Sequence, residues 1–198
     1  EIEELCRWAQ SRSIKILIDE SFADFANSEK RYTLISADIL AEHSNLYVIK
    51  SIGKSFGVAG LRLGVLASSD TEFIASAKRK ISIWNINPFG EFFMEIMPRY
   101  RAEYVHGCDL IAAARHRFLE NLKTIPFLKV FPSEANFVLA RVTKPFDATS
   151  LTNLLWEKHK ILLKDCSNKK GFSNGQYVRI TVRDDGDNEA LIQILKGL

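Results

Sequence analysis

The most informative stretch of this sequence is Ser51-Ile52-Gly53-Lys54-Ser55-Phe56-Gly57-Val58-Ala59-Gly60-Leu61-Arg62-Leu63-Gly64. Glycines recur after the lysine every three or four residues, a spacing that allows tight turns and close approach of a ligand. Ser51 and Arg62 could both hold a phosphate, one through its hydroxyl and the other through its planar fork. The amine of Lys54 could form a Schiff base with a carbonyl compound. A lone lysine among glycines is more often a solvated loop residue, so this prediction depends on the whole spacing.

Two nucleotide-binding interpretations of this stretch are excluded by its spacing. The phosphate loop of nucleoside-triphosphate enzymes needs four residues between two glycines, followed by Lys and Ser or Thr. The dinucleotide motif needs Gly-x-Gly-x-x-Gly. Gly57, Gly60 and Gly64 match neither pattern.

The residues around this stretch predict an α/β layer. A helix over the first dozen residues leads into an apolar strand at 15–18, and further strands are expected at 46–49 and 63–67. The first strand stops at Asp19-Glu20, and two carboxylates after a buried strand are costly unless they face a cleft. Strands with polar residues at their ends indicate a site along the strand termini. Alternatively, Asp19 serves as a cap or turn residue.

The second half of the sequence predicts a compact α+β unit. A long helix is expected from about 98 to 122, followed by strands at 127–131, 136–140, 161–163 and 177–182 and by helices at 149–159 and 188–195. We place the domain boundary in the long helix, which gives two domains, 1–110 and 111–198. Trp84 in Trp84-Asn85-Ile86-Asn87 is expected to be a buried residue beside turn asparagines, although a place in the cleft is the alternative.

Composition excludes several classes of protein. The chain is 46% hydrophobic and 26% charged with a formal net charge of +3, so neither disorder nor nucleic-acid binding is indicated. Its three cysteines have no paired spacing and its four histidines no ligand spacing, so we expect no disulfide framework and no metal site. No apolar run is long enough to cross a membrane and the start does not resemble a signal peptide, so a cytoplasmic location is expected.

Four landmarks occur in a characteristic order: Asp19-Glu20-Ser21-Phe22, the lysine stretch, Pro132-Ser133-Glu134-Ala135-Asn136-Phe137, and Leu163-Lys164-Asp165-Cys166 leading to Tyr177-Val178-Arg179-Ile180. In these features the sequence resembles the class I and II aminotransferases of fold type I, which depend on pyridoxal 5'-phosphate. The closest likeness is to the branch of histidinol-phosphate aminotransferase and threonine-phosphate decarboxylase. The resemblance implies an α/β fold with the later part of the large cofactor domain at 1–110 and the small α+β domain at 111–198.

The resemblance also implies roles for individual residues. Lys54 would hold the cofactor as a Schiff base and move a proton at the substrate α-carbon. Asp19 would pair with the pyridinium nitrogen and keep the ring protonated. Ser51 and Arg62 would bind the cofactor phosphate, and Arg179 would bind the substrate α-carboxylate. An exposed strand arginine is the alternative for Arg179.

Three positions depart from the family pattern. Phe22 replaces a common tyrosine. Phenylalanine can pack but cannot donate a hydrogen bond to the cofactor, and the decarboxylase branch resembles this sequence in tolerating phenylalanine there. Lys164 stands where family members usually have an arginine that contacts the distal group of the substrate. Lysine keeps the positive charge but lacks the planar guanidinium that binds an anion through two hydrogen bonds. Gly53 replaces a frequent serine and removes a hydroxyl from the phosphate site. Because of these departures, the sequence does not identify the substrate.

The resemblance predicts an aminotransferase acting on an amino acid and a keto acid or phosphorylated substrate, within a homodimer. A decarboxylase of the threonine-phosphate type is the alternative, and a non-catalytic aminotransferase-like module of a fusion protein is an alternative of another class. Members of this family are considerably longer than 198 residues. We therefore expect a C-terminal fragment that is weakly active or inactive alone.

Overall fold

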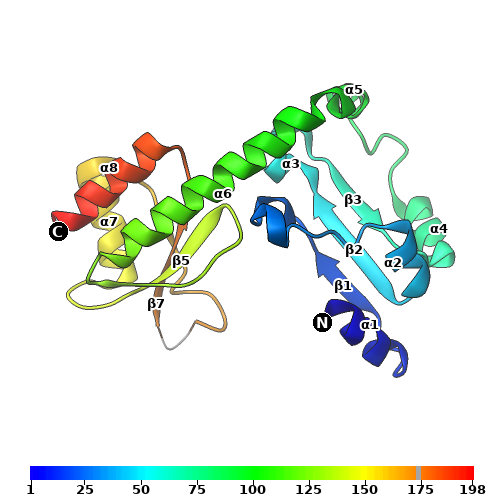
Figure 1. The fold of residues 1–198 in the computed structure, drawn as a ribbon, viewed down its shortest axis with the longest axis horizontal. Helices are drawn as coiled ribbons and strands as arrows, with labels where there is room; N and C mark the ends of the chain where they lie inside the picture. Colours follow the sequence, from blue (N-terminus) through cyan, green and yellow to red (C-terminus); the bar gives the residue numbers. More distant parts are fainter. Residues whose placement is uncertain (173–174) are drawn as a thin grey trace. The chain divides into compact units, whose positions relative to one another are not determined.

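The computed structural model describes residues 1–172 and 175–198 (Figure 1). The chain divides into two compact units, which we describe separately. The first comprises Glu1–Asp24 and Ser28–His106, and the second comprises Phe25–Asn27 and Gly107–Leu198. The division within the long helix falls near the boundary predicted from sequence, and the assignment of the units to the large and small domains of a family member stays a prediction.

A three-stranded sheet forms the centre of the first unit. Its strands are β1 (Ile16–Asp19), β2 (Leu46–Ser51) and β3 (Gly64–Ala67), in that order. β1 runs parallel to β2, and β3 runs antiparallel to it. Leu46 and Val48 are fully buried and pack with Cys6 and Leu34 in one cluster, so the apolar runs that predicted β1 and β2 do form this core.

Helices surround this sheet in the sequence order α1 (Ile2–Gln10), η1 (Ala23–Phe25), η2 (Ser28–Lys30), α2 (Ala37–Glu42), α3 (Ile52–Ser55), η3 (Ala59–Leu61), α4 (Thr71–Lys80), α5 (Pro88–Ile96) and η4 (Met97–Tyr100). The side chain of Asp70 caps α4, and that of Asn87 caps α5 ahead of Pro88. The prediction for Trp84 is wrong, because its side chain is 91% exposed between α4 and α5.

The second unit contains a four-stranded antiparallel sheet. Its strands are β4 (Leu128–Val130), β5 (Phe137–Val142), β6 (Lys164–Asp165) and β7 (Gln176–Thr181), in the order β4-β5-β7-β6. Its helices are α6 (Arg101–Lys123), which begins in the first unit, α7 (Ala148–His159) and α8 (Asp185–Lys196). One core joins sheet and helices and includes Phe118, Leu122, Val138, Leu151, Leu155, Val178, Ile180 and Ile192.

The strand predicted at Ile161–Leu163 is misplaced, because β6 starts at Lys164. Lys160 ends α7 in the left-handed conformation with φ +58°, and the Ile161 amide bonds back to Leu155. The chain therefore needs these residues for the turn out of the helix before it can pair with β7.

Arg115, from α6, attaches residues 25–27 to the second unit. Its guanidinium donates to the carbonyl oxygen of Phe25, to Asn27 Oδ1 at 2.9 Å and to Glu134 Oε2 at 2.8 Å. The side chain is 2% exposed, whereas that of Glu134 is 42% exposed, so the buried guanidinium is fully paired, as a stable buried charge requires.

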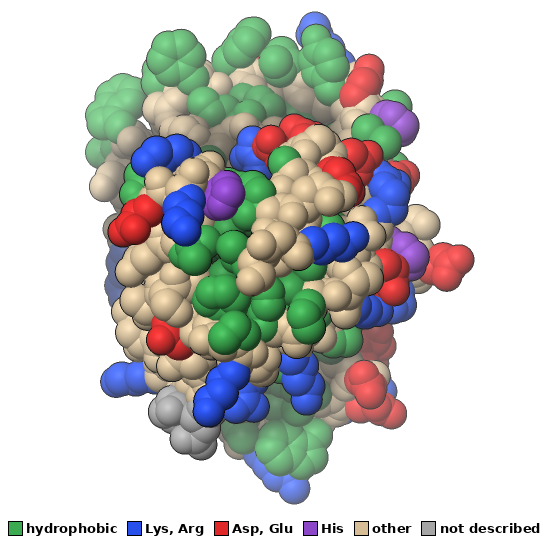
Figure 2. Space-filling view, turned by 90° about the vertical axis from the view of Figure 1, so that its left-hand side faces the viewer, with side chains coloured by type: hydrophobic (Ala, Val, Ile, Leu, Met, Phe, Trp, Pro, Cys, Tyr) green, Lys and Arg blue, Asp and Glu red, His purple; other side chains and the backbone are tan. Residues whose placement is uncertain are grey.

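Charge is mixed over the side shown in Figure 2. Lys and Arg side chains and Asp and Glu side chains lie around a central apolar area on this face, in keeping with a net charge of only +3. Among the described residues, no helix combines the length and apolar character needed to cross a membrane.

Candidate active site

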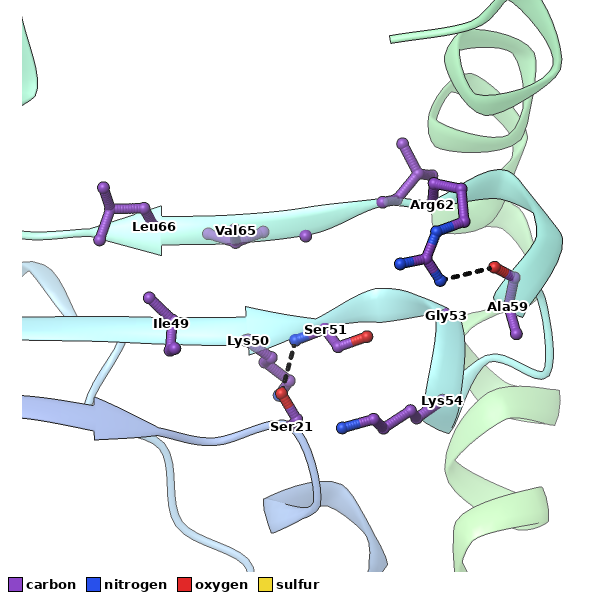
Figure 3. Close-up of a pocket in the computed structure, with 12 residues that line it drawn as sticks. Ser21, Ile49, Lys50, Ser51, Gly53, Lys54, Ala59, Arg62, Val65 and Leu66 are labelled. Atoms are coloured by element: carbon purple, nitrogen blue, oxygen red, sulfur yellow. Dashed lines mark hydrogen bonds between the residues drawn. The ribbon is translucent and has the colours of Figure 1, made fainter. Parts of the chain in front are cut away.

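A pocket of about 650 Å³ lies in the first unit, where β2 ends and β3 begins. Its polar lining comes from Ser21, Lys50, Ser51, Lys54 and Arg62 (Figure 3). β2 turns directly into the short helix α3, which carries Lys54. The structure therefore brings three of the residues predicted from sequence, Ser51, Lys54 and Arg62, into one pocket.

Lys54 projects an exposed amine toward the region after β1. Its Nζ atom lies 4.1 Å from the centroid of the Phe22 ring, a distance at which the face of an aromatic ring attracts a cation. Phe22 thus lies beside Lys54 and can orient its amine without offering a hydrogen-bond donor.

Ser51 and Arg62 bring a hydroxyl and a guanidinium to one side of the pocket. Arg62 has φ +58°, a left-handed conformation that is uncommon for a residue with a side chain and often marks a functional site. Its Nη1 atom donates to the carbonyl oxygen of Ala59 at 3.3 Å, which fixes the guanidinium in the pocket wall. Figure 3 shows Ser51 and Arg62 at the same end of the pocket.

Gly53 keeps the turn beneath this end of the pocket tight. A Cβ atom at this position would lie 3.0 Å from Cα of Ala59 and 3.3 Å from the carbonyl oxygen of Val58. The serine that is frequent in the family would therefore crowd the backbone of Val58 and Ala59 here, and glycine avoids that crowding.

Asp19 ends β1 beside Ile49 of β2. Hydrogen bonds from Ser21, through its side chain and its backbone N–H, and the positive charge of Lys54 lower the pKa of the Asp19 carboxyl. The backbone bond, from the Ser21 N–H to Oδ1, is 2.9 Å long. Asp19 is not part of the pocket wall, but its carboxylate stays ionised next to it.

Ser21 is a site residue that sequence reasoning missed. It is buried, and its Oγ atom accepts a hydrogen bond from the Ser51 N–H at 3.0 Å. Ser21 therefore contacts both Asp19 and Ser51. Its position directly after the acidic pair was the signal that could have identified it.

Glu20 has a structural role although it follows Asp19 directly. Its side chain is buried, and its oxygens accept hydrogen bonds from the Thr33 hydroxyl at 2.7 Å and the Leu34 N–H at 2.6 Å. Of the two carboxylates at the end of β1, only Asp19 is exposed.

Arg179 and Lys164, the two predicted substrate residues, lie together in the second unit. They are register partners on β7 and β6, and both are exposed. The guanidinium carbon of Arg179 lies 5.1 Å from the centroid of the Phe137 ring, and stacking of this kind orients an arginine fork. The pair forms a positively charged site on this sheet.

A possible metal-ligand group occurs elsewhere in the first unit. Glu3, Glu42 and His43 place ligand atoms within 4.8 Å of one another, a proximity that sequence spacing did not indicate. Glu3 accepts a hydrogen bond from Tyr32 at 3.0 Å, and Glu42 pairs with Arg7 at 3.3 Å. Both carboxylates thus already have protein partners.

The residues of the pocket suit a phosphorylated aldehyde. A guanidinium and a hydroxyl match the charge and hydrogen-bonding needs of a phosphate ester, and a neighbouring lysine amine matches a carbonyl carbon. An ionised carboxylate nearby matches a protonated ring nitrogen. The donor set therefore fits pyridoxal 5'-phosphate.

Comparison with known proteins gives consistent results. The chain is 33% identical to CMP-5'-(3-aminopropyl)phosphonate synthase of Streptomyces rubellomurinus, over 90% of this chain and 28% of that protein. It is 30% identical to L-serine phosphate decarboxylase of Sulfurospirillum multivorans, over 93% of this chain and 47% of that protein. The solved histidinol-phosphate aminotransferase of Clostridium acetobutylicum superposes with a TM-score of 0.86 and 29% identity, over 98% of this chain and 57% of that one.

The fold is that of the pyridoxal-phosphate-dependent transferases of fold type I. The chain belongs to the aminotransferase class I and II family, whose model matches residues 1–195. Pyridoxal 5'-phosphate is the cofactor of this family. The predicted fold class, family branch and cofactor are thus confirmed. The chain spans 28% to about half the length of the curated relatives it matches.

Proposed function

We propose that this chain carries the reactive lysine of an enzyme that transfers an amino group between an amino acid and a keto acid or phosphorylated substrate. The observation that carries the proposal is the convergence of Lys54, Ser51 and Arg62 on one pocket. Bound pyridoxal phosphate supplies an electron-accepting ring for the electrons released at the substrate α-carbon. Lys54 holds the cofactor covalently and, once released, moves the proton at that carbon.

The other site residues have binding roles in this proposal. Ser51 and Arg62 hold the cofactor phosphate, and Asp19 pairs with the ring nitrogen. Phe22 packs beside the Lys54 amine. Arg179 binds the α-carboxylate of the substrate, and Lys164 binds its distal group.

The distal group that we propose is a phosphate or phosphonate. The relatives compared above are named for serine phosphate, histidinol phosphate and an aminopropylphosphonate. A lysine is a point charge that suits such an anion without requiring the bidentate geometry of an arginine.

Decarboxylation of a phosphorylated amino acid is the second candidate function, and the identity of 30% with a serine phosphate decarboxylase favours it. In that reaction the bond from the α-carbon to the carboxylate breaks and carbon dioxide leaves, whereas transfer removes a proton from the same carbon. Phe22, in place of tyrosine, is compatible with this candidate.

The first experiment tests the role of Lys54 in the whole protein. Mixing with pyridoxal phosphate should give a visible absorption band, and borohydride should then fix the label on the peptide that contains Lys54. Lys54→Ala should lose the label, and Lys78→Ala, at an exposed lysine of α4, should retain it. Absence of label from Lys54 contradicts the proposal and favours a non-catalytic module.

A second experiment separates the two reactions. Glutamate formed from 2-oxoglutarate with a phosphorylated amino donor indicates transfer, and carbon dioxide released from phosphoserine or phosphothreonine indicates decarboxylation. A protein that yields neither product from any of these compounds contradicts the proposed substrate class.

We also propose that the whole protein acts as a homodimer. The segment between α4 and α5 exposes Ile83 and Trp84, each 91% accessible, and such apolar exposure is typical of a surface that a partner covers. Sedimentation should give the mass of a dimer, and Trp84→Ser should shift it toward the monomer.

A further inference from the structure

A second lysine lines the same pocket as Lys54. Lys50 lies on β2, four residues earlier, and is 16% exposed in its side chain. Two amines beside one carbonyl site compete for it, because either can condense with an aldehyde. The protein therefore needs a means of directing the reaction to one of them.

Asp24 holds the amine of Lys50. The Nζ atom of Lys50 lies 2.6 Å from Asp24 Oδ1, and the Asp24 side chain is 15% exposed. Tyr104 donates its hydroxyl to Asp24 Oδ2 at 2.5 Å. Burial acts to raise the pKa of the Asp24 carboxyl, but the hydrogen bonds from Lys50 and Tyr104 outweigh it, and the pKa is lowered. The carboxylate is thus a fixed negative partner for Lys50.

Asp24 also sits between the segments that surround Lys54. Phe22, two residues before Asp24, lies beside the Lys54 amine at 4.1 Å. Tyr104, the hydroxyl partner of Asp24, stacks on Phe56, two residues after Lys54, with ring centroids 3.8 Å apart and planes 6° from parallel. The same carboxylate thereby holds Lys50 and, through Tyr104, connects to Phe56 on the segment that carries Lys54.

We propose that Asp24 is a positioning residue that sequesters Lys50 and leaves Lys54 as the amine that reacts with the cofactor. This inference rests on the proposed function of the pocket. A lysine reacts only as the free amine: its nitrogen attacks the aldehyde carbon, a C=N bond forms and water leaves. An amine whose Nζ atom is engaged by a largely buried carboxylate at 2.6 Å is not available for this step.

The distribution of label between the two lysines tests the proposal in the whole protein. After treatment with pyridoxal phosphate and borohydride, we expect the wild type to carry label on Lys54. In Asp24→Asn, the share of label on Lys50 should rise roughly tenfold or more, as expected when a hydrogen bond between charged groups is lost. Asp24→Glu should restore the wild-type distribution, and Glu29→Gln, which removes an exposed acid from η2, should leave it unchanged.

A measurement without the cofactor covers the case in which Asp24→Asn does not fold. Trace acetylation with acetic anhydride in the unmutated protein should modify Lys54 several-fold faster than Lys50. Equal acetylation of both lysines, or Asp24→Asn protein labelled on Lys54 alone, overturns the inference. Failure of pyridoxal phosphate to label either lysine of the wild type would instead overturn the proposed function, and the acetylation ratios of the wild type and Asp24→Asn, compared, would still decide whether Asp24 sequesters Lys50.

Discussion

Lys164 and Arg179 stand directly opposite each other as register partners of β6 and β7. Like charges at facing positions of an antiparallel pair destabilise it. Both side chains are exposed, so solvent reduces the repulsion. A bound anion relieves it further, and the pair is therefore suited to receive the negative groups of a substrate.

The proposed bidentate binding of the substrate carboxylate by the Arg179 guanidinium can be tested with Arg179→Lys, which keeps the charge but removes the second hydrogen bond. We expect the KM for the amino substrate of the whole protein to rise roughly 10- to 100-fold, with a smaller change in kcat. Arg117→Lys, at an exposed arginine of α6 paired with Asp185, should leave KM unchanged. If KM is unchanged in Arg179→Lys, then Arg179 is an ordinary exposed arginine of the strand and does not bind the substrate.

The buried Arg115 is expected to dominate the stability of the second unit. Arg115→Met removes the donor to Phe25, Asn27 and Glu134. Because the buried Phe25 then loses the donor to its carbonyl oxygen and the partly exposed Glu134 carboxylate loses this partner, the free energy of unfolding should fall by about 2 kcal/mol. Urea unfolding measures this change.

Arg117→Met is the matched control for Arg115→Met, because Arg117 lies on the same helix but forms an exposed ion pair with Asp185. Its loss should cost less than about 1 kcal/mol. Similar losses in the two variants would show that burial of Arg115 contributes little.

The tight backbone at Gly53 makes a further prediction. In Gly53→Ala the new Cβ atom meets the backbone of Ala59 at 3.0 Å. Crowding of this kind typically costs about 1–3 kcal/mol, so both the thermal midpoint and the affinity for pyridoxal phosphate should fall. Gly60→Ala, where a Cβ atom meets nothing within 4 Å, should change neither. Equal behaviour of the two variants in calorimetry and cofactor titration would contradict this account.

Acid should weaken the first unit through Asp24. Its folded-state pKa lies below the ordinary value of 3.8, so its ionised form contributes stability that is fully present above that value. The contribution is lost as pH falls through the folded-state pKa. The free energy of unfolding should therefore decrease as pH falls below about 5, and less steeply in Asp24→Asn than in the wild type. Parallel curves for the two proteins would rule Asp24 out as a source of acid sensitivity.

The sequence predicted the parts of the site that are local in the chain. Ser51, Lys54 and Arg62 could be identified because their spacing is set by one strand, one turn and one short helix. The caps Asp70 and Asn87 were readable signals for α4 and α5, although these helices were not predicted. The strand predicted at 161–163 does not coincide with β6, because the left-handed conformation of Lys160 at the end of α7 cannot be inferred from apolar periodicity.

Contacts between distant parts of the sequence could not be predicted in this way. Asp24 and Tyr104 are 80 residues apart, and nothing in either neighbourhood indicates that they share a hydrogen bond. Trp84 was expected to be buried because tryptophan is a large apolar residue, whereas its actual exposure depends on which other elements pack against residues 81–87. The sequence could not show that Arg179 and Lys164 face each other, because strand register is a property of the folded sheet.

Ser21 fixes the distance between Asp19 and Ser51 through two hydrogen bonds. Its backbone N–H is bonded to Asp19, and its hydroxyl is bonded to the backbone of Ser51, so one small residue spans the distance between the proposed partners of the ring nitrogen and of the phosphate. In the roles proposed for these residues, a ligand would engage Asp19 and Ser51 together only if the separation of its own charged ends matched that distance. Ligands whose phosphate arm is longer or shorter by one carbon would be sorted by geometry alone.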